Sequence, residues 1–334
     1  MDKTELRLDP LTREWTIFTE GRALAPEFGP ATAGSFSESP FRAGLERYAP
    51  HTLHHAGGPG GWQVRVVPNR VPVLRVEGDH APNGNGFYQH LDGVGAHEIV
   101  IEDPASRRFE ELHVGEAELV VNAWRARIED LMRDSRLVAF SVLKATGTAA
   151  GQTIAHSISQ VFAMAVIPGA LRAKLDSAKA WFAAHRRSLF AEIIEHEQRS
   201  ADRLVYENAG FLAFCPYAAR APFEISVWPK RQCADFHHIN AGEACQLADA
   251  LLAVLRKLNH ALDYPAYHFA LTTAPSRAPA ADHWDTLDED FRWHATITPR
   301  LHTPGVIESA TGCHVNGVWP EIAADVLRHQ EAQP

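Results

Sequence analysis

The sequence of 334 residues predicts an α+β fold made of two similar halves. Residues 62–76 alternate apolar and polar side chains, which is typical of a half-buried β-strand. Residues 110–134 carry apolar side chains at helical spacing, as expected for a helix that packs on a sheet. Two segments then recur about 127 residues later, and this offset indicates an internal duplication. The recurring segments are Glu98–Pro104 with Glu224–Pro229, and Phe109–Ala117 with Phe236–Ala244.

The expected elements follow one another in the same general order in both halves. We expect a turn with a short strand at 5–22, a long loop at 23–61 and strands at 62–76 and 95–104. A helix at 110–134, a strand at 137–144 and a charged helix at 170–200, which connects the halves, should follow. Two further strands are expected at 267–275 and 291–301. The loop is expected from its many glycine, proline, alanine and serine residues. The two halves are expected at 1–172 and 173–334.

The composition limits the partners and the compartment of the protein. A net charge of −9 and a pI of about 6.1 offer no basic surface to nucleic acid or to an anionic membrane. The four cysteines form no Cys-x-x-Cys pair, which is typical of a reducing compartment. The sequence opens on no hydrophobic leader and contains no apolar run of roughly 18 residues. We therefore expect a cytoplasmic protein that binds neither nucleic acid nor membranes.

The segment Gly147–Pro168 carries the strongest functional signal. A loop rich in glycine and alanine runs into a strand in which His156, Ile158 and Gln160 stand at every second position. Alternate side chains of a strand share a face, so the two serines between them are expected on the opposite face. Small residues let a phosphate approach the loop backbone, and the polar strand residues would line its pocket. A pair of satisfied core residues is the alternative interpretation of His156 and Gln160.

This segment resembles the active-site strand of the galactose-1-phosphate uridylyltransferase family, within the histidine-triad superfamily. The family run reads Gly-Ala-Ser-x-x-His-Pro-His-x-Gln, and its second histidine is the nucleophile that accepts a nucleotidyl group. Ile158 stands at that place here. Residues 7–15 match the family's Arg-x-Asp-Pro-x-Thr-x-x-Trp, and Asn69 corresponds to an asparagine that contacts the base and ribose. The resemblance covers nearly the whole chain and implies two histidine-triad-like halves, with antiparallel sheets covered by helices.

The resemblance also identifies the places where the family holds metal ions. A zinc site needs thiolate or imidazole ligands, and other residue types hold most of these places here. The corresponding positions are Ser39, Arg42, Ser106 and His156 for one site, and Ser188, Ala191, Gln232 and Arg292 for the other. We therefore expect no bound metal and no other cofactor.

The active-site residues implied by the resemblance fall into two groups. The candidate catalytic residues are His156, Gln160 and His294, because Ile158 has no lone pair with which to attack phosphorus. The candidate substrate-binding residues are Phe41, Asn69, Gly151, Gln152, Thr153 and Gln160. The expected ligand is a phosphorylated small molecule, which can be a nucleotide, a nucleotide sugar or a sugar phosphate. A homodimer is compatible with this expectation.

Two classes of function remain open. The chain is either an enzyme that acts on a nucleotide sugar or sugar phosphate without the covalent nucleotidyl-histidine, or a catalytically silent protein that binds such a ligand. Ile158 argues against a third reading, the ordinary ping-pong uridylyltransferase. The survival of Asn69, Thr153, Gln160 and His294 favours the enzyme, although the sequence does not identify its substrate.

Overall fold

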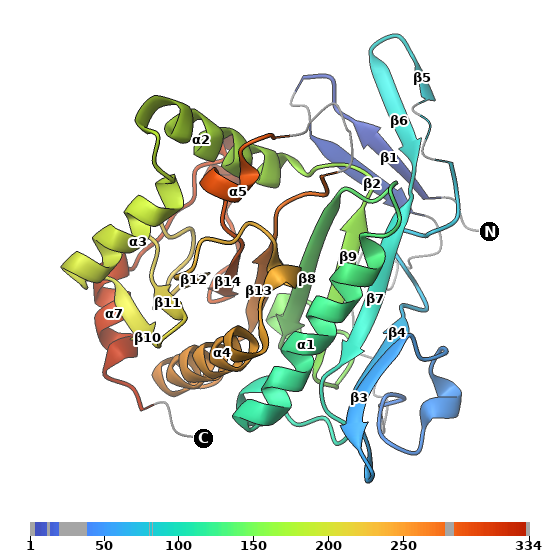
Figure 1. The fold of residues 1–334 in the computed structure, drawn as a ribbon, viewed down its shortest axis with the longest axis horizontal. Helices are drawn as coiled ribbons and strands as arrows, with labels where there is room; N and C mark the ends of the chain where they lie inside the picture. The colour runs from blue at the N-terminus through green and yellow to red at the C-terminus, as the bar shows by residue number, and fades with distance from the viewer. Residues whose placement is uncertain are drawn as a thin grey trace.

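The computed structural model describes residues 4–11, 14–19, 39–79, 81, 83–277 and 284–331. Its main element is a ten-stranded sheet in the order β10-β11-β12-β14-β13-β8-β9-β7-β4-β3 (Figure 1). The bounds of these strands, in sheet order, are Leu204–Glu207, Phe211–Phe214, Ile225–Pro229, His294–Pro299, Tyr267–Thr272, Ala139–Thr146, Ile158–Met164, Gly95–Ile101, Gly61–Pro68 and His54–Gly58. Every neighbouring pair that the sheet contains is antiparallel, as the resemblance implies.

The sheet order makes the duplication visible. The first half runs β7, a 3₁₀ helix η2, helix α1, β8 and β9; the second half runs β12, η4, α4, β13 and β14. The bounds are Phe109–Glu111 for η2, Val114–Leu131 for α1, Phe236–His238 for η4 and Ala241–Leu262 for α4. Each half contributes five strands, and the halves meet where β8 pairs with β13. The predicted α+β class with duplicated halves is confirmed, and the two sheets are joined edge to edge into one.

A smaller sheet lies beside the first half, in the order β2-β1-β6-β5. Its strands are Trp15–Thr19, Thr4–Leu8, Tyr88–Asp92 and Asn83–Asn85. The remaining helices are α2 (Gly169–His185), α3 (Leu189–Ser200), α5 (Leu287–Asp290), α6 (Val306–Thr311) and α7 (Pro320–Arg328). Among the helices that the structure describes, none is long and apolar enough to cross a membrane.

Helices α1 and α4 lie side by side on one face of the large sheet (Figure 1). They bury a continuous apolar core, to which Val142 and Val161 of the first half and Phe269 and Ile297 of the second half contribute. The other face is covered in the second half by a separate apolar cluster that includes Leu175 of α2 and Phe190 of α3. The side of the central strands that faces away from α1 and α4 is only partly covered, and we call it the open face; the residues on it are Ser141, Leu143, Gln160, Phe162, Ala270 and Thr272.

Several predicted elements differ from those observed. The strand predicted at 62–76 ends at Pro68, and the helix predicted at 110–134 begins only at Val114, after the short turn η2. Within the predicted loop 23–61, residues 54–58 form β3, whereas 23–38 lie outside the described residues. The strand predicted at 95–104 ends at Ile101.

The predicted connecting helix at 170–200 is wrong, since two helices occupy this segment. Arg186 adopts a left-handed conformation with φ 58°, which ends α2. The hydroxyl of Ser188 then accepts a hydrogen bond from the backbone N–H of Ala191 and caps the start of α3. The predicted boundary between the halves, at 172, falls inside α2.

A buried ion pair fastens α1 to the sheet. The guanidinium of Arg127 donates two hydrogen bonds to the carboxylate of Glu98 on β7, at 2.7 and 2.8 Å. Both side chains are buried. Loss of one partner leaves the other charge without compensation in the core, which is far more costly than loss of an exposed pair.

We expect Arg127→Met to lower the free energy of unfolding by about 3–5 kcal/mol, measured by urea denaturation. Methionine preserves much of the side-chain length, so the loss of charge pairing dominates. Arg133→Met is the control, because the Arg133 side chain is 77% exposed and pairs with Asp130 at 3.4 Å. That substitution should change stability by less than about 0.5 kcal/mol. Equal effects of the two substitutions would contradict this account.

Candidate functional site

The open face holds a polar network that joins three segments of the first half. The backbone N–H of Val73 donates to Nδ1 of His97 at 3.2 Å, so the other ring nitrogen carries the proton. This Nε2–H donates to Oε1 of Gln160 at 2.5 Å. The side-chain nitrogen of Asn69 lies 3.0 Å from the same Nε2, which places Asn69 next to the pair without a hydrogen bond in this tautomer, because both groups are donors. The structure therefore brings together Asn69 and Gln160, two of the candidate binding residues, through a histidine that the sequence analysis did not select.

The network also orients the amide of Gln160. Its carbonyl oxygen accepts from His97, and its NH₂ group has no partner among the described residues. Gln160 is half-buried on the open face and lies opposite Leu143, whose side chain is 36% exposed. An amide with its acceptor engaged and its donors free is suited to an anionic ligand.

Position 158, to which the resemblance assigns the nucleophile, is part of an apolar cluster. Ile158 begins β9 and packs with the residues Phe41, Val67, Ile99 and Ile101, together with Ala49, Trp62 and Ile154. The candidate binding residue Phe41 is buried in this cluster. The substitution of isoleucine for histidine is therefore matched by an apolar environment, in which a charged or nucleophilic group would be poorly solvated.

The loop before β9 is closed by its own side chains. Gly147 and Gly151 adopt φ 83° and 81°, which favours glycine at both positions. Oε1 of Gln152 accepts from the backbone N–H of Gly147 at 2.7 Å, and its NH₂ donates to the carbonyls of Ile154 and His156. Gln152, a candidate binding residue, thus uses its polar atoms inside the loop. Gly151 and Thr153 are exposed on the loop surface.

His156 lies before the strand, which begins at Ile158; the prediction that the strand carries His156 is wrong. Its ring is only 1% exposed, and Nε2–H donates to the carbonyl of Asp103 at 2.8 Å. Burial lowers the pKa of His156 below its ordinary value, which favours the neutral ring. The ring edge also meets Phe41, with 6.0 Å between ring centroids.

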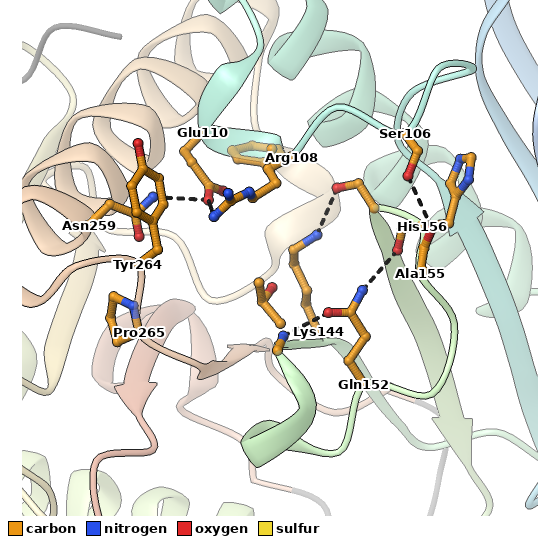
Figure 2. Close-up of a pocket in the computed structure, with 14 residues that line it drawn as sticks. Ser106, Arg108, Glu110, Lys144, Gln152, Ala155, His156, Asn259, Tyr264 and Pro265 are labelled. Atoms are coloured by element: carbon orange, nitrogen blue, oxygen red, sulfur yellow. Dashed lines mark hydrogen bonds and ion pairs between the residues drawn. The ribbon is translucent and has the colours of Figure 1, made fainter. Parts of the chain in front are cut away.

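The side chains of the alternate positions point to the helix-covered face, as predicted for the two serines. Ser159 accepts a hydrogen bond from the indole N–H of Trp124 at 2.7 Å. Ser157 donates to the carboxylate of Glu102 at 2.6 Å, and the ammonium of Lys144 donates to the same oxygen at 2.5 Å. Ser157 and Lys144 form part of the wall of a cavity of about 330 Å³ (Figure 2).

The third candidate catalytic residue, His294, lies in the other half. Strands β8 and β13 separate β9 from β14, so at least about 14 Å separates His294 from Gln160 at roughly 4.8 Å per strand. His294 is 3% exposed, its Nδ1–H donates to the carbonyl of Arg292 at 3.0 Å, and the ammonium of Lys174 donates to Nε2 at 2.7 Å. Both ring nitrogens are therefore engaged, and the structure does not bring His294 together with the other two.

The residues at the family's metal positions do not fit a metal ion. Nε2 of His156 is engaged by Asp103, and the hydroxyl of Ser106 donates to the carbonyl of Ala155 at 3.4 Å. At the second position set, Arg292 donates to the carbonyls of Pro229 and Lys230 and to Oε1 of Gln232. At a position that the resemblance assigns to a metal ligand, a guanidinium thus donates hydrogen bonds instead. Within the described ranges, no group of three or more His, Cys, Asp or Glu could hold a metal.

The sequence analysis missed three polar residues, of which His97 and Lys144 are buried and Lys174 on α2 is exposed. His97 lies in a strand that is buried along its whole length, and Lys144 shares a face of β8 with the core residues Phe140 and Val142. A polar or charged residue at a position whose periodicity predicts burial is a detectable anomaly. That signal was present for His97 and Lys144. The pairing of Lys174 with His294 needs the tertiary structure.

The known proteins that are similar to this chain match it over nearly its full length. No protein-family model matches the chain. ADP-glucose phosphorylase of Arabidopsis thaliana is 30% identical over 334 residues, which cover 97% of this chain and 92% of the relative. Galactose-1-phosphate uridylyltransferase of Thermotoga maritima is 25% identical over 339 residues, which cover 98% and 99%. The crystal structure of the Arabidopsis thaliana phosphorylase with bound ADP-glucose has a TM-score of 0.78 and 28% identity, and covers 98% of this chain and 99% of that one.

The Lys174–His294 pair generates a pH-dependent prediction. Burial, and then the neighbouring Lys174 ammonium, lower the pKa of His294 to about 3, from 6.5 in an unperturbed histidine. Between these values the unfolded chain binds a proton that the folded chain does not. The free energy of unfolding therefore falls as the pH drops below 6.5, by up to about 1.4 kcal/mol per pH unit from this residue.

We expect His294→Gln to remove this dependence, because glutamine can accept from Lys174 but does not titrate. The stability difference between the wild type and this variant should shrink from pH 7 to pH 5, where carboxylates change little. Urea denaturation at three or four pH values measures the difference. A difference that does not vary with pH would show that His294 titrates normally.

Proposed function

The chain belongs to the family that contains ADP-glucose phosphorylase and galactose-1-phosphate uridylyltransferase, and we propose that it acts on a nucleotide sugar or sugar phosphate without a covalent nucleotidyl-histidine. The observation that carries the proposal is the contrast between two neighbouring positions of β9. Ile158 is packed in an apolar cluster, whereas Gln160 keeps free amide donors on the open face. The nucleophile is absent while a phosphate-binding group remains.

Neither of the two candidate histidines, His156 and His294, offers a substitute nucleophile. His156 is 1% exposed, its Nε2–H donates to a backbone carbonyl, and its remaining lone pair at Nδ1 is buried beyond the reach of a ligand. His294 accepts from Lys174 through the lone pair that an attack on phosphorus would need. These contacts support a reaction in which the acceptor itself attacks.

In such a reaction an oxygen of the acceptor phosphate forms a bond to the α-phosphorus of the nucleotide sugar. The bond from that phosphorus to the bridging oxygen breaks, and the sugar phosphate leaves with both bonding electrons. The role of the protein is then to hold the two phosphates in line, which can supply a large part of the rate enhancement. Gln160 and the backbone of the loop Gly147–Gly151 are the groups that we assign to this task.

A catalytically silent binding protein is the second candidate. The same free amide of Gln160 would serve it, and the apolar setting of Ile158 supports it equally. Turnover separates the two candidates: both bind the ligand, but only the enzyme converts it.

We expect incubation with ADP-glucose or UDP-glucose to leave the intact mass of the protein unchanged, because the isoleucine at position 158 cannot be nucleotidylated. Release of glucose 1-phosphate in the presence of inorganic phosphate or galactose 1-phosphate would identify the enzyme. With a chiral α-thio nucleotide sugar, one direct transfer should invert the configuration at phosphorus. A mass increase of one nucleoside monophosphate, or net retention, would contradict the proposal. Binding without turnover would favour the silent protein.

We expect Gln160→Ala to weaken binding of ADP-glucose or UDP-glucose about tenfold or more, since hydrogen bonds to a charged group contribute roughly 1.5–3 kcal/mol each. Gln160→Glu keeps an acceptor for His97 but places a negative charge toward the phosphates, and should weaken binding further. Calorimetry measures both.

The matched control is Gln198→Ala, which removes an exposed glutamine of α3 that donates to Glu207. It should leave the affinity unchanged. Equal affinities for the wild type and both Gln160 variants would exclude the open face as the phosphate site.

A further inference from the structure

Lys174 is bonded to a neutral group, unlike most of the other lysines that the structure describes. Its Nζ donates to Nε2 of His294 at 2.7 Å. Among the described residues, no carboxylate pairs with Lys174. Three other lysines form ion pairs with carboxylates and a fourth donates to backbone carbonyls; these are Lys144, Lys179, Lys230 and Lys257. The charge of Lys174 therefore lacks the compensation that an anionic partner gives.

The imidazole that Lys174 contacts lies among aromatic side chains. The ring centroids of Phe190, Trp228 and Phe291 are 5.6, 5.8 and 6.1 Å from that of His294. The His294 residue is 3% exposed, whereas Lys174 is exposed. The lysine nitrogen thus lies where an apolar interior meets solvent, and a reagent can reach it from outside.

A second cation, Arg220, faces Lys174 from the loop before β12. Its guanidinium repels the ammonium of Lys174, and the carboxylate of Glu224 attracts it. That carboxylate already accepts from the backbone N–H of Arg220 at 3.0 Å and lies 3.5 Å from its Nε. Desolvation of the nitrogen, and then Arg220, lower the pKa of Lys174 from 10.5 to about 8. At pH 8 about half of the Lys174 side chains are therefore neutral amines.

The cluster of Lys174, His294, Arg220 and Glu224 favours one kind of reagent. A lysine becomes a nucleophile when an apolar setting or a cationic neighbour favours the neutral amine. Lys174 and Arg220 bring two positive charges against the single carboxylate of Glu224, so an anionic reagent is attracted. Acyl phosphates combine both requirements, because the acyl carbon is electrophilic and the phosphate is an anionic leaving group.

We propose that Lys174 is a modification site that accepts an acyl group from an acyl phosphate. Nζ forms a bond to the carbonyl carbon, and the bond from that carbon to the phosphate oxygen breaks. Inorganic phosphate leaves with the bonding electrons, beside the guanidinium of Arg220. The amine loses its proton to Nε2 of His294, which then releases it to water. This site is independent of the phosphate-binding role proposed for Gln160.

Acetyl phosphate tests the proposal on the full chain. The protein is acetylated at pH 8 to a low extent and digested, and mass spectrometry measures the acetylation of each lysine. We expect Lys174 to react about tenfold or more faster than Lys179, an exposed lysine of the same helix that pairs with Asp285 at 2.7 Å. The two rates should become equal in urea. Equal rates in the folded protein, or a preference for Lys174 that persists in urea, would overturn the proposal.

Arg220→Gln tests the assignment of an anionic reagent. This variant should slow the acetylation of Lys174 by acetyl phosphate severalfold more than its acetylation by p-nitrophenyl acetate, which is neutral. The matched control is Arg187→Gln, since the side chains of Arg187 and Arg220 are both 55% exposed. The control should change neither rate. Equal slowing with both reagents would show that Arg220 acts on the amine alone and would exclude the acyl phosphate.

His294→Gln tests the proton acceptor. Glutamine keeps an acceptor for Lys174 but cannot take up the proton, so this variant should slow both reagents severalfold and to the same degree. An unchanged rate would contradict the role of His294.

Discussion

The pairing of β8 with β13 is the constraint on which the rest of the architecture depends. Six residue pairs join the two halves, from Tyr267 with Thr146 to Thr272 with Ser141. Because this register aligns the two sheets, α1 and α4 come to share one apolar layer, and the open face continues across the seam. The cavity exists for the same reason, since its two walls come from different halves. Any shift of this pairing by one residue would exchange the buried and open faces of one half.

Apolar packing and a polar network lie two residues apart on strand β9. Isoleucine suits a β-strand, and at position 158 it packs against side chains from the neighbouring strand β7. Gln160 lies two positions along the strand, so alternation keeps it on the same face, where it bonds to His97. An apolar side chain at position 158 is therefore compatible with the polar contacts of Gln160 on the same strand.

The sequence predicted the α+β class, the duplication and the face assignment of Ser159 and Gln160, since all three follow from periodicity and repetition. It did not predict the break at Arg186, because a left-handed conformation of arginine has no strong local signal. It also grouped His156, Gln160 and His294, which the fold separates: three strand spacings lie between β9 and β14. Strand order is a tertiary property, and neither the spacing along the chain nor the chemistry of a single histidine determines it.

The guanidinium of Arg292 has a consequence for how the protein matures in the cell. It bridges the carbonyls of Pro229 and Lys230 and the amide of Gln232, so the end of β12 and the start of β14 are joined by a group that is part of the chain. A domain that is closed by an ion must wait for that ion, and its yield follows the metal supply. Here the closing group is synthesised with the polypeptide. The hydrogen bonds that close this corner of the molecule are therefore available as soon as Arg292 and residues 229–232 come together in folding.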